Sequence, residues 1–326
     1  MKPTDFGINL TKYLTVYLPR QRGISQNTIK SYADTFRLLF TYYQDELGKK
    51  PEKLTVSEFN STLINGFLDW LELKRENSIS TRNQRLSAIQ AFSRFLLVET
   101  PENFALLQAN LQIQRKKCTK PQIGYLTISE TTELLRKPDT TTSNGRRDLA
   151  LLSLLYDSGA RVSELTQLRV RDVRLDDFPI VVLHGKGSKI RRVPLMKNTA
   201  NIISSYLKEN NLLGNEKLDY HLFTNRQHNP LTRAGVTYIL QKYTENDRVT
   251  PHVIRHTKAM HLLQSGINLL YIRDILGHSS IDTTSIYARA DTEMKRKAME
   301  LVDKEVTPNV PDWRSDNALL DWLKQL

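Results

Sequence analysis

The residues best suited to chemistry lie in three short segments in the second half of the chain. In the first segment, Tyr156–Leu165, an apolar stretch stops at Gly159 and Arg161 lies in the first turn of a new helix. An arginine at that position lies beside unpaired backbone N–H groups, where an anion binds readily. Taken alone, however, the segment favours a surface ion pair between Arg161 and Glu164 or Asp157.

The second segment is Pro251–His261, in which His252 and Arg255 are three residues apart and therefore share one helix face. His252 and His256 have the i,i+4 spacing found in some zinc enzymes. No glutamate follows His252, and no thiolate ligand is at hand because the chain has a single cysteine, Cys118. The sequence therefore predicts no metal site and no disulfide framework.

The third segment is Leu276–Arg289, which places His278 nine residues before Tyr287. One tyrosine among 13 is ordinarily a core or surface residue, so this segment alone indicates no chemistry. Upstream, two β-rich runs within Pro179–Leu195 flank a Gly-Lys-Gly sequence centred on Lys186. That pattern predicts a β-hairpin.

Together, these segments resemble the tyrosine recombinase (phage integrase) family, and the chain looks like a Xer-like member. The residues that carry the resemblance occur in the family's order and approximate spacing: Arg161, Lys186, His252, Arg255, His278 and Tyr287. The match covers the catalytic half from about Thr127 to Arg289, and Ser25–Tyr32 resembles the family's core-binding helical domain. The stretch Arg255–Gly266 is similar to recombinases carried by transposable elements.

The resemblance implies cleavage of a phosphodiester without a metal ion, ATP or any other cofactor. Tyr287 would attack the phosphorus and form a 3′-phosphotyrosyl link, which keeps the energy of the bond and lets a 5′-hydroxyl reverse the step. Arg161 and Arg255 would clamp the scissile phosphate, a role that arginine fills better than lysine.

The resemblance also assigns the proton transfers. Lys186 would protonate the leaving 5′-oxygen, with Lys189 as the rival candidate. His252 would assist proton transfer at the tyrosine, and His278 would hydrogen-bond the phosphate. All six catalytic positions carry a competent residue, which argues against a catalytically silent DNA-binding regulator.

Apolar residues at helical spacing predict the elements around these segments. One helix follows Ser25 or Asn27, with an apolar face made of Ile29, Tyr32, Phe36, Leu39, Phe40 and Tyr43. Another follows Ser80 or Thr81, and a further one covers residues 64–71. In the second half, a helix begins at Thr127 or Ser129, another covers residues 149–156, and helical patterns resume from Thr199.

The 326 residues suggest two domains, and the net charge of +12 favours a polyanionic partner. Seven of the excess positive charges fall in residues 1–120 and five in residues 121–326, so both halves share the surplus. We expect a core-binding domain over 1–111, a basic linker over 112–125, a catalytic domain over 126–306 and a C-terminal linker and helix over 307–326. That short apolar helix is expected to dock on a neighbouring protomer.

The expected fold is therefore mainly α with a small β-sheet, arranged as a two-domain C-shaped clamp around double-stranded DNA. Strand exchange would proceed in a homotetrameric synapse through a Holliday junction, alone or with a second recombinase or accessory factor. The candidate contacts to the DNA backbone are basic residues near the linker, hairpin and second segment: Arg115, Lys116, Lys117, Lys120, Lys189, Arg191 and Lys258. For Lys258, a helix-surface position is the simpler interpretation.

The start of the chain has no apolar signal core and no later stretch is apolar enough to span a membrane, so the sequence predicts a cytoplasmic, nucleoid-associated protein without a membrane partner. Two other activities stay open at this point. A nicking-closing enzyme like the type IB topoisomerases would use the same phosphotyrosine chemistry without synapsis. A metal-dependent hydrolase built on the histidines is weakened by the lack of acidic ligands near His252 and His256.

Overall fold

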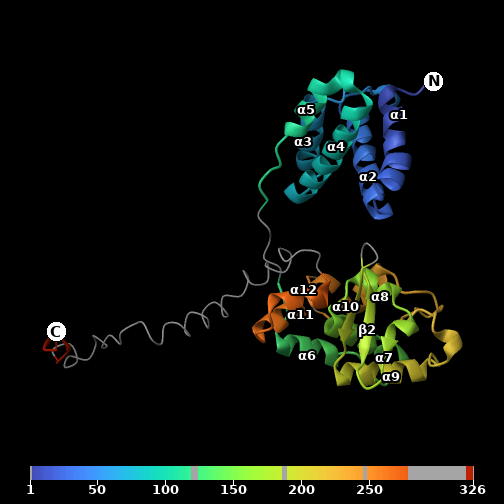
Figure 1. The fold of residues 1–326 in the computed structure, drawn as a ribbon, viewed down its shortest axis with the longest axis vertical. Helices are drawn as coiled ribbons and strands as arrows, with labels where there is room; N and C mark the ends of the chain where they lie inside the picture. The colour runs from blue at the N-terminus through green and yellow to red at the C-terminus, as the bar shows by residue number, and fades with distance from the viewer. Residues whose placement is uncertain (1, 119–123, 186–188, 245–247, 278–320, 326) are drawn as a thin grey trace. The chain divides into compact units, whose positions relative to one another are not determined.

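The computed structural model of the chain describes residues 2–118, 124–185, 189–244, 248–277 and 321–325. Within these residues the fold is mainly helical with one three-stranded sheet, which confirms the predicted mainly α fold with a small β-sheet. The chain divides into two compact units, Met1–Pro121 and Gln122–Leu326 (Figure 1). No helix in the described part of the chain is long and apolar enough to cross a membrane.

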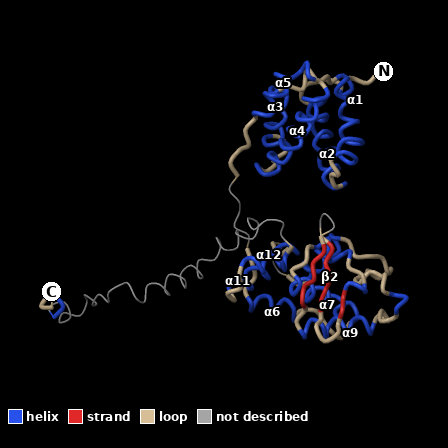
Figure 2. The backbone as a smooth tube through the Cα atoms, in the orientation of Figure 1, coloured by secondary structure: helices blue, strands red, loops and turns tan. Residues whose placement is uncertain are grey.

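Helices alone build the described part of the N-terminal unit (Figure 2). In chain order they are α1 (Asp5–Lys12), a π-helical segment (Tyr13–Gln21), α2 (Gln26–Asp45), α3 (Ser61–Leu73), α4 (Ile79–Glu99) and α5 (Phe104–Gln112), with short 3-10 turns at Pro51–Lys53 and Pro101–Asn103. Aromatic rings fill the centre: the Phe92 ring lies 5.0 Å from that of Phe36 and 5.5 Å from that of Phe6. These edge-on contacts join α1, α2 and α4 in one core.

The predicted helices of this unit are present, and one predicted start is wrong. Ser25 caps α2, since its side-chain oxygen accepts the N–H of Thr28. The helix expected after Ser80 or Thr81 begins instead at Ile79, because the oxygen of Ser78 accepts the N–H of Thr81 and caps α4. Several residues of capping type follow one another here, so composition could not select the right one.

The chain that leaves α5 lies along α4. The side-chain amide of Asn83 donates to the carbonyl oxygen of Lys116 at 2.8 Å, and its oxygen accepts the N–H of Lys116 at 3.1 Å. Nearby, Lys116 Nζ lies 2.8 Å from a carboxylate oxygen of Glu72, and Arg115 donates to Ser87 Oγ at 3.1 Å. The first residues after α5 are therefore fixed to the N-terminal unit.

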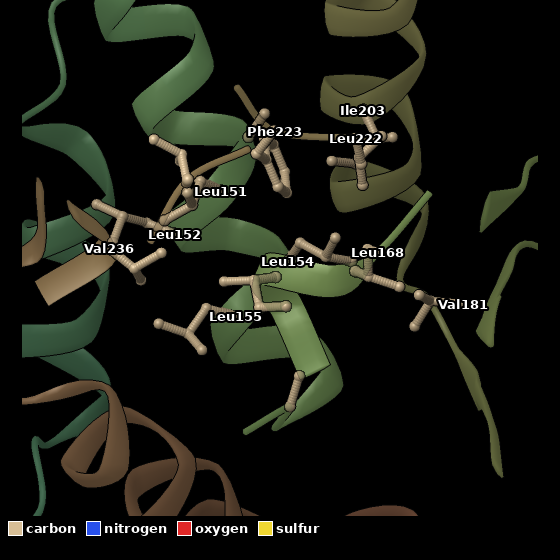
Figure 3. Packing of buried hydrophobic residues seen from close by; sticks show 14 of the residues in the cluster. Leu151, Leu152, Leu154, Leu155, Leu168, Val181, Ile203, Leu222, Phe223 and Val236 are labelled. Atoms are coloured by element: carbon tan, nitrogen blue, oxygen red, sulfur yellow. The ribbon is translucent and has the colours of Figure 1, made fainter. Parts of the chain in front are cut away.

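The second unit surrounds a central helix, α7, with helices and a small sheet. Its elements are α6 (Ile128–Arg136), α7 (Ser143–Ser158), α8 (Val162–Gln167), β1 (Val173–Arg174), β2 (Ile180–His184), β3 (Ile190–Pro194), α9 (Lys197–Glu209), α10 (Arg233–Lys242), α11 (Pro251–Gln264) and α12 (Leu269–Leu276), with short 3-10 turns at Val170–Asp172 and Asn215–Lys217. Leu151, Leu154 and Leu155 of α7 are buried among residues from the neighbouring elements (Figure 3). A helix covered on several sides needs apolar residues around most of its circumference, as 149–156 has.

The sheet contains the hairpin that the sequence predicts. β2 pairs antiparallel with both β1 and β3, and the β2–β3 register places Val182 opposite Arg192 and His184 opposite Ile190. Val181 and Leu183 face the core from β2. β1 was not expected, because two residues are too few to show an alternating pattern.

Helices α11 and α12 form a small apolar layer of their own. Ile272 and Leu276 of α12 pack on Ala259, Met260 and Leu263 of α11. α12 ends at Gly277, which adopts the left-handed conformation with φ 63°. This packing fixes the carboxyl end of α12 within the unit.

Candidate active site

Arg161 lies between two helices of the second unit. Gly159 ends α7 in the left-handed conformation, and Arg161 is the capping residue that precedes α8. Its backbone N–H donates to Glu164 Oε2 at 2.7 Å, and its Nη1 donates to Glu164 Oε1 at 2.9 Å. The simple ion pair suggested by the sequence is thus present with Glu164, whereas Asp157 pairs with Lys258.

Arg255 projects from α11 into the interior and is only 2% exposed. Its Nη1 donates to the carbonyl oxygen of Gly159 at 2.7 Å, and its Nη2 donates to that of Leu276 at 2.6 Å. Arg255 therefore joins the end of α7 to the end of α12. A buried cation needs such acceptors, since desolvation is costly.

Three arginines meet the carboxyl end of α12, and we call Arg161, Arg191 and Arg255 the arginine cluster. Arg191 Nε donates to Ile275 O at 2.9 Å, Arg255 donates to Leu276 O, and Arg161 Nη2 donates to Gly277 O at 3.2 Å. The last carbonyls of a helix have no partners within it and carry partial negative charge. Three consecutive carbonyls thus hold three guanidinium groups, and the next residue in the chain is His278.

Glu164 provides the negative charge within the cluster. It is 4% exposed and binds Arg191 with both oxygens, at 2.9 and 2.8 Å, in addition to Arg161. Burial alone would raise the pKa of this carboxyl, but hydrogen bonds from Arg191 and the Arg161 backbone, together with the charge of Arg191, lower the pKa to about 2. One carboxylate against three guanidinium groups leaves a positive site that suits a phosphate.

The sequence suggests Glu164 only as a surface ion-pair partner, whereas the structure buries its side chain between Arg161 and Arg191. A signal was available, because a glutamate three residues after the residue that precedes a helix commonly binds back to that residue's N–H. Glu164 stands at that distance from Arg161 and makes that bond.

His252 lies in the first turn of α11, and its side chain is partly exposed to solvent. Its pKa is lowered from 6.5, first by partial burial and then by the positive charges of Arg255 and Arg161. The imidazole is therefore neutral at pH 7 and able to accept a proton. His252 precedes Arg255 by three residues in α11, so the two residues share one face of that helix.

Four predicted site residues lie outside the described residues: Lys120, Lys186, His278 and Tyr287. Lys189 directly precedes β3 and is exposed. Its carbonyl oxygen accepts the N–H of Gly185 at 2.7 Å. Arg115, Lys116 and Lys117 are exposed on the N-terminal unit.

Two predicted DNA contacts differ from the exposed cations that the sequence suggested. Arg191 has an 11% exposed side chain and is held by Glu164 and Ile275. Lys258 has a 15% exposed side chain that lies 3.2 Å from Asp157 and 5.0 Å from the centre of the Tyr156 ring, so it is more enclosed than the helix-surface position that the sequence favours. In both cases a buried carboxylate on a neighbouring element attracts the charge inward.

The remaining histidines of α11, His256 and His261, lie inside the second unit. His256 is buried, and His261 joins the hydroxyl of Tyr156 at 2.8 Å to the carbonyl of Leu126 at 2.9 Å. In the part of the chain that the structure describes, no group of three or more His, Cys, Asp or Glu side chains could hold a metal ion.

Comparison with protein families gives two matches along the chain. A model described as the phage integrase family matches residues 125–294, and one described as the phage integrase N-terminal SAM-like domain matches residues 11–100. The two matched regions fall in different compact units.

Full-length relatives and solved structures agree with these matches. The chain is 36% identical to the Sinorhizobium fredii protein y4rC, over 97% of both chains, and 32% identical to the tyrosine recombinase XerC of Bacillus subtilis, over 88% of this chain and 94% of that one. Among structures, a XerH recombinase bound to its difH substrate matches with a TM-score of 0.67 at 20% identity, covering 86% of this chain and 82% of that chain. The Tn1549 transposon integrase in complex with transposon end DNA matches with a TM-score of 0.66 at 18% identity, covering 88% and 97%.

Proposed function

The chain belongs to the phage integrase family and is a site-specific DNA recombinase, and we propose that it cleaves DNA with Tyr287 as nucleophile while the arginine cluster holds the scissile phosphate. The observation that carries the proposal is the convergence of Arg161 and Arg255 on adjacent carbonyls at the end of α12. It concentrates positive charge directly beside the segment that begins with His278.

Arg161 is the member of the cluster that would contact the phosphate most directly. Its side chain is 39% exposed, and its bonds to Glu164 and Gly277 leave further N–H donors of the guanidinium for an anion. Arg255 would contribute mainly through its charge, from a buried position that the two carbonyls fix. Preorganised donors of this kind stabilise the charge that develops during phosphoryl transfer.

The proton transfers would be divided between groups on both sides of the phosphate. The neutral His252 would accept the proton of Tyr287 as the tyrosine oxygen bonds to phosphorus. Lys186 would give a proton to the 5′-oxygen as its bond to phosphorus breaks, and His278 would hydrogen-bond a non-bridging oxygen. No metal ion, ATP or other cofactor enters this scheme.

We further propose the assembly in which this chemistry is used. The two units would contact opposite sides of the duplex, and four copies would exchange strands through a 3′-phosphotyrosyl intermediate and a Holliday junction on nucleoid DNA in the cytoplasm. The segment 307–326 would pass to a neighbouring protomer. The name of one structural neighbour, a transposon integrase, supports a role in a mobile element. A second recombinase or an accessory factor would be a further partner.

Covalent trapping tests the nucleophile. The chain is incubated in EDTA with fragmented DNA of its host, denatured, and the DNA that stays attached to protein is sequenced. We expect adducts with the wild type and with Tyr238→Phe, a control at an exposed tyrosine of α10, and none with Tyr287→Phe. Adducts of equal yield with Tyr287→Phe would overturn the proposal.

A further inference from the structure

Arg191 binds three elements of the second unit together. From β3 it donates to Ile275 O at the end of α12 and, through both terminal nitrogens, to Glu164 of α8. All three kinds of guanidinium nitrogen are therefore engaged. A side chain held in this way, and only 11% exposed, is poorly placed to bind a DNA backbone.

The Glu164–Arg191 pair also lies against two glycines. A Cβ at Gly277 would come within 2.9 Å of Arg191 Nη1 and 3.0 Å of its Cδ. A Cβ at Gly185 would come within 3.4 Å of Glu164 Oε1 and 3.9 Å of Arg191 Nη1. The backbone thus passes close to the ion pair at two places far apart in the sequence.

Each of these glycines directly precedes a residue to which the proposed function gives a role. Gly185 is followed by Lys186, and Gly277 is followed by His278. The same carboxylate accepts two hydrogen bonds from Arg161. One ion pair therefore touches the phosphate-binding arginine and the chain positions from which two further groups extend.

We propose that Arg191 is a positioning residue for strand cleavage. Arg191 holds the carboxylate of Glu164, which in turn fixes the position of the Arg161 guanidinium. Arg191 and Glu164 also restrain the backbone at Gly185 and Gly277, the residues that directly precede Lys186 and His278. This inference rests on the proposed function, and it assigns Arg191 no contact with DNA.

The variant Arg191→Lys tests whether the hydrogen bonds of Arg191 matter for cleavage, separately from its positive charge. Lysine keeps the positive charge but cannot bind both oxygens of Glu164 and Ile275 O in one plane. We expect DNA affinity within about twofold of wild type, because no phosphate contact is lost. Cleavage should slow by about 100-fold, the typical cost of misplacing reacting groups by an ångström. The matched control is Arg192→Lys, on the same strand with an exposed side chain, which should cleave like wild type.

The experiment measures single-turnover cleavage of a recombination site that carries a nick beside the scissile phosphate. Two substrates are compared, with oxygen or with sulfur as the 5′ bridging atom. In both, the bond from the tyrosine oxygen to phosphorus forms as the bond to the 5′ atom breaks. A thiolate leaves without a proton, because thiols have a pKa of about 8.5. The sulfur substrate therefore removes the need for Lys186.

If Arg191 positions Lys186, the defect of Arg191→Lys shrinks at least about tenfold on the sulfur substrate, since proton transfer alone contributes about 100-fold or more. The inference is overturned if Arg191→Lys cleaves as fast as Arg192→Lys, or if its rate defect is equal on the two substrates. It is also overturned if Arg191→Lys binds DNA more weakly by the same factor by which its cleavage slows. Should Arg191→Lys lose its thermal unfolding transition, Glu164→Asp takes its place, because it keeps the charge and draws the carboxylate back by one methylene. The wild type and Tyr287→Phe are run in parallel, so that a failed nucleophile assignment is distinguished from a failed positioning role.

Discussion

Glu164→Gln removes the carboxylate that Arg161 and Arg191 share and keeps the volume of the side chain. The pKa of Glu164 is about 2 in the folded chain, against 4.5 for the unperturbed side chain. This gap of about 2.5 units corresponds to about 3 kcal/mol of folding free energy at neutral pH, at about 1.4 kcal/mol per unit. With 4% exposure, screening by solvent reduces this value little.

The sign of the pH dependence follows from the lowered pKa. The contribution of Glu164 is complete above pH 4.5 and is lost as the pH falls toward about 2, because the unfolded chain then binds a proton that the folded chain does not. By pH 3, about 2 kcal/mol of it is gone. Glu164→Gln has no such proton to bind, so its stability should fall by about 2 kcal/mol less than that of wild type between pH 7 and pH 3.

Urea titrations followed by circular dichroism measure this difference. The two units can unfold separately, and the transition that Glu164→Gln shifts at pH 7 identifies the second unit. Glu130→Gln is the matched control, because Glu130 occupies the equivalent position at the start of α6 but is exposed. Parallel stability curves for wild type and Glu164→Gln from pH 7 to pH 3 would refute the reasoning.

Three further expectations concern groups around the site. Cleavage should fall as the pH drops through the pKa of His252, which lies below 6.5, and the pH–rate profile of His252→Ala should lack this limb. Lys258→Ala should destabilise the second unit by about 3 kcal/mol in urea titrations, because the buried Asp157 loses its cationic partner and keeps, among the described residues, only the N–H of Met196, and unchanged stability would contradict that pairing. Lys189→Ala should lower the slope of log affinity against log salt by about one in gel-shift titrations, whereas Lys258→Ala should leave that slope unchanged.

Helix positions and the hairpin could be predicted because their signals are local. Apolar residues at helical spacing located α2, α3 and α4, and the Gly-Lys-Gly turn between β-rich runs located β2 and β3. The end of α7 could also be predicted, because a glycine, Gly159, follows the apolar stretch. Arg161 and Arg255 were identified by resemblance, and the structure brings them to adjacent carbonyls of one helix end.

The roles of Arg191 and Glu164 depend on burial, which the sequence expresses weakly. Arg191 and Arg192 are adjacent and chemically identical, yet only Arg191 lies on the strand face that continues with Val193 and Leu195, both buried. Alternation along β3 carried this information, but a run of basic residues indicated a solvated DNA-binding patch instead. The pairing of Lys258 with Asp157 had no comparable signal, since 101 residues separate the two.

The contact between Gly159 and Leu276 limits how this part of the chain can evolve. A Cβ at position 159 would lie 2.8 Å from Leu276 Cδ2, and both Gly159 and Gly277 have positive φ. A smaller residue at 276 would relieve the collision but not the backbone strain, so a second-site change can rescue a substitution at 159 only in part. Variation at positions 159, 276, 277 and 191 is therefore epistatic, and libraries that alter recombination specificity should keep these four positions constant.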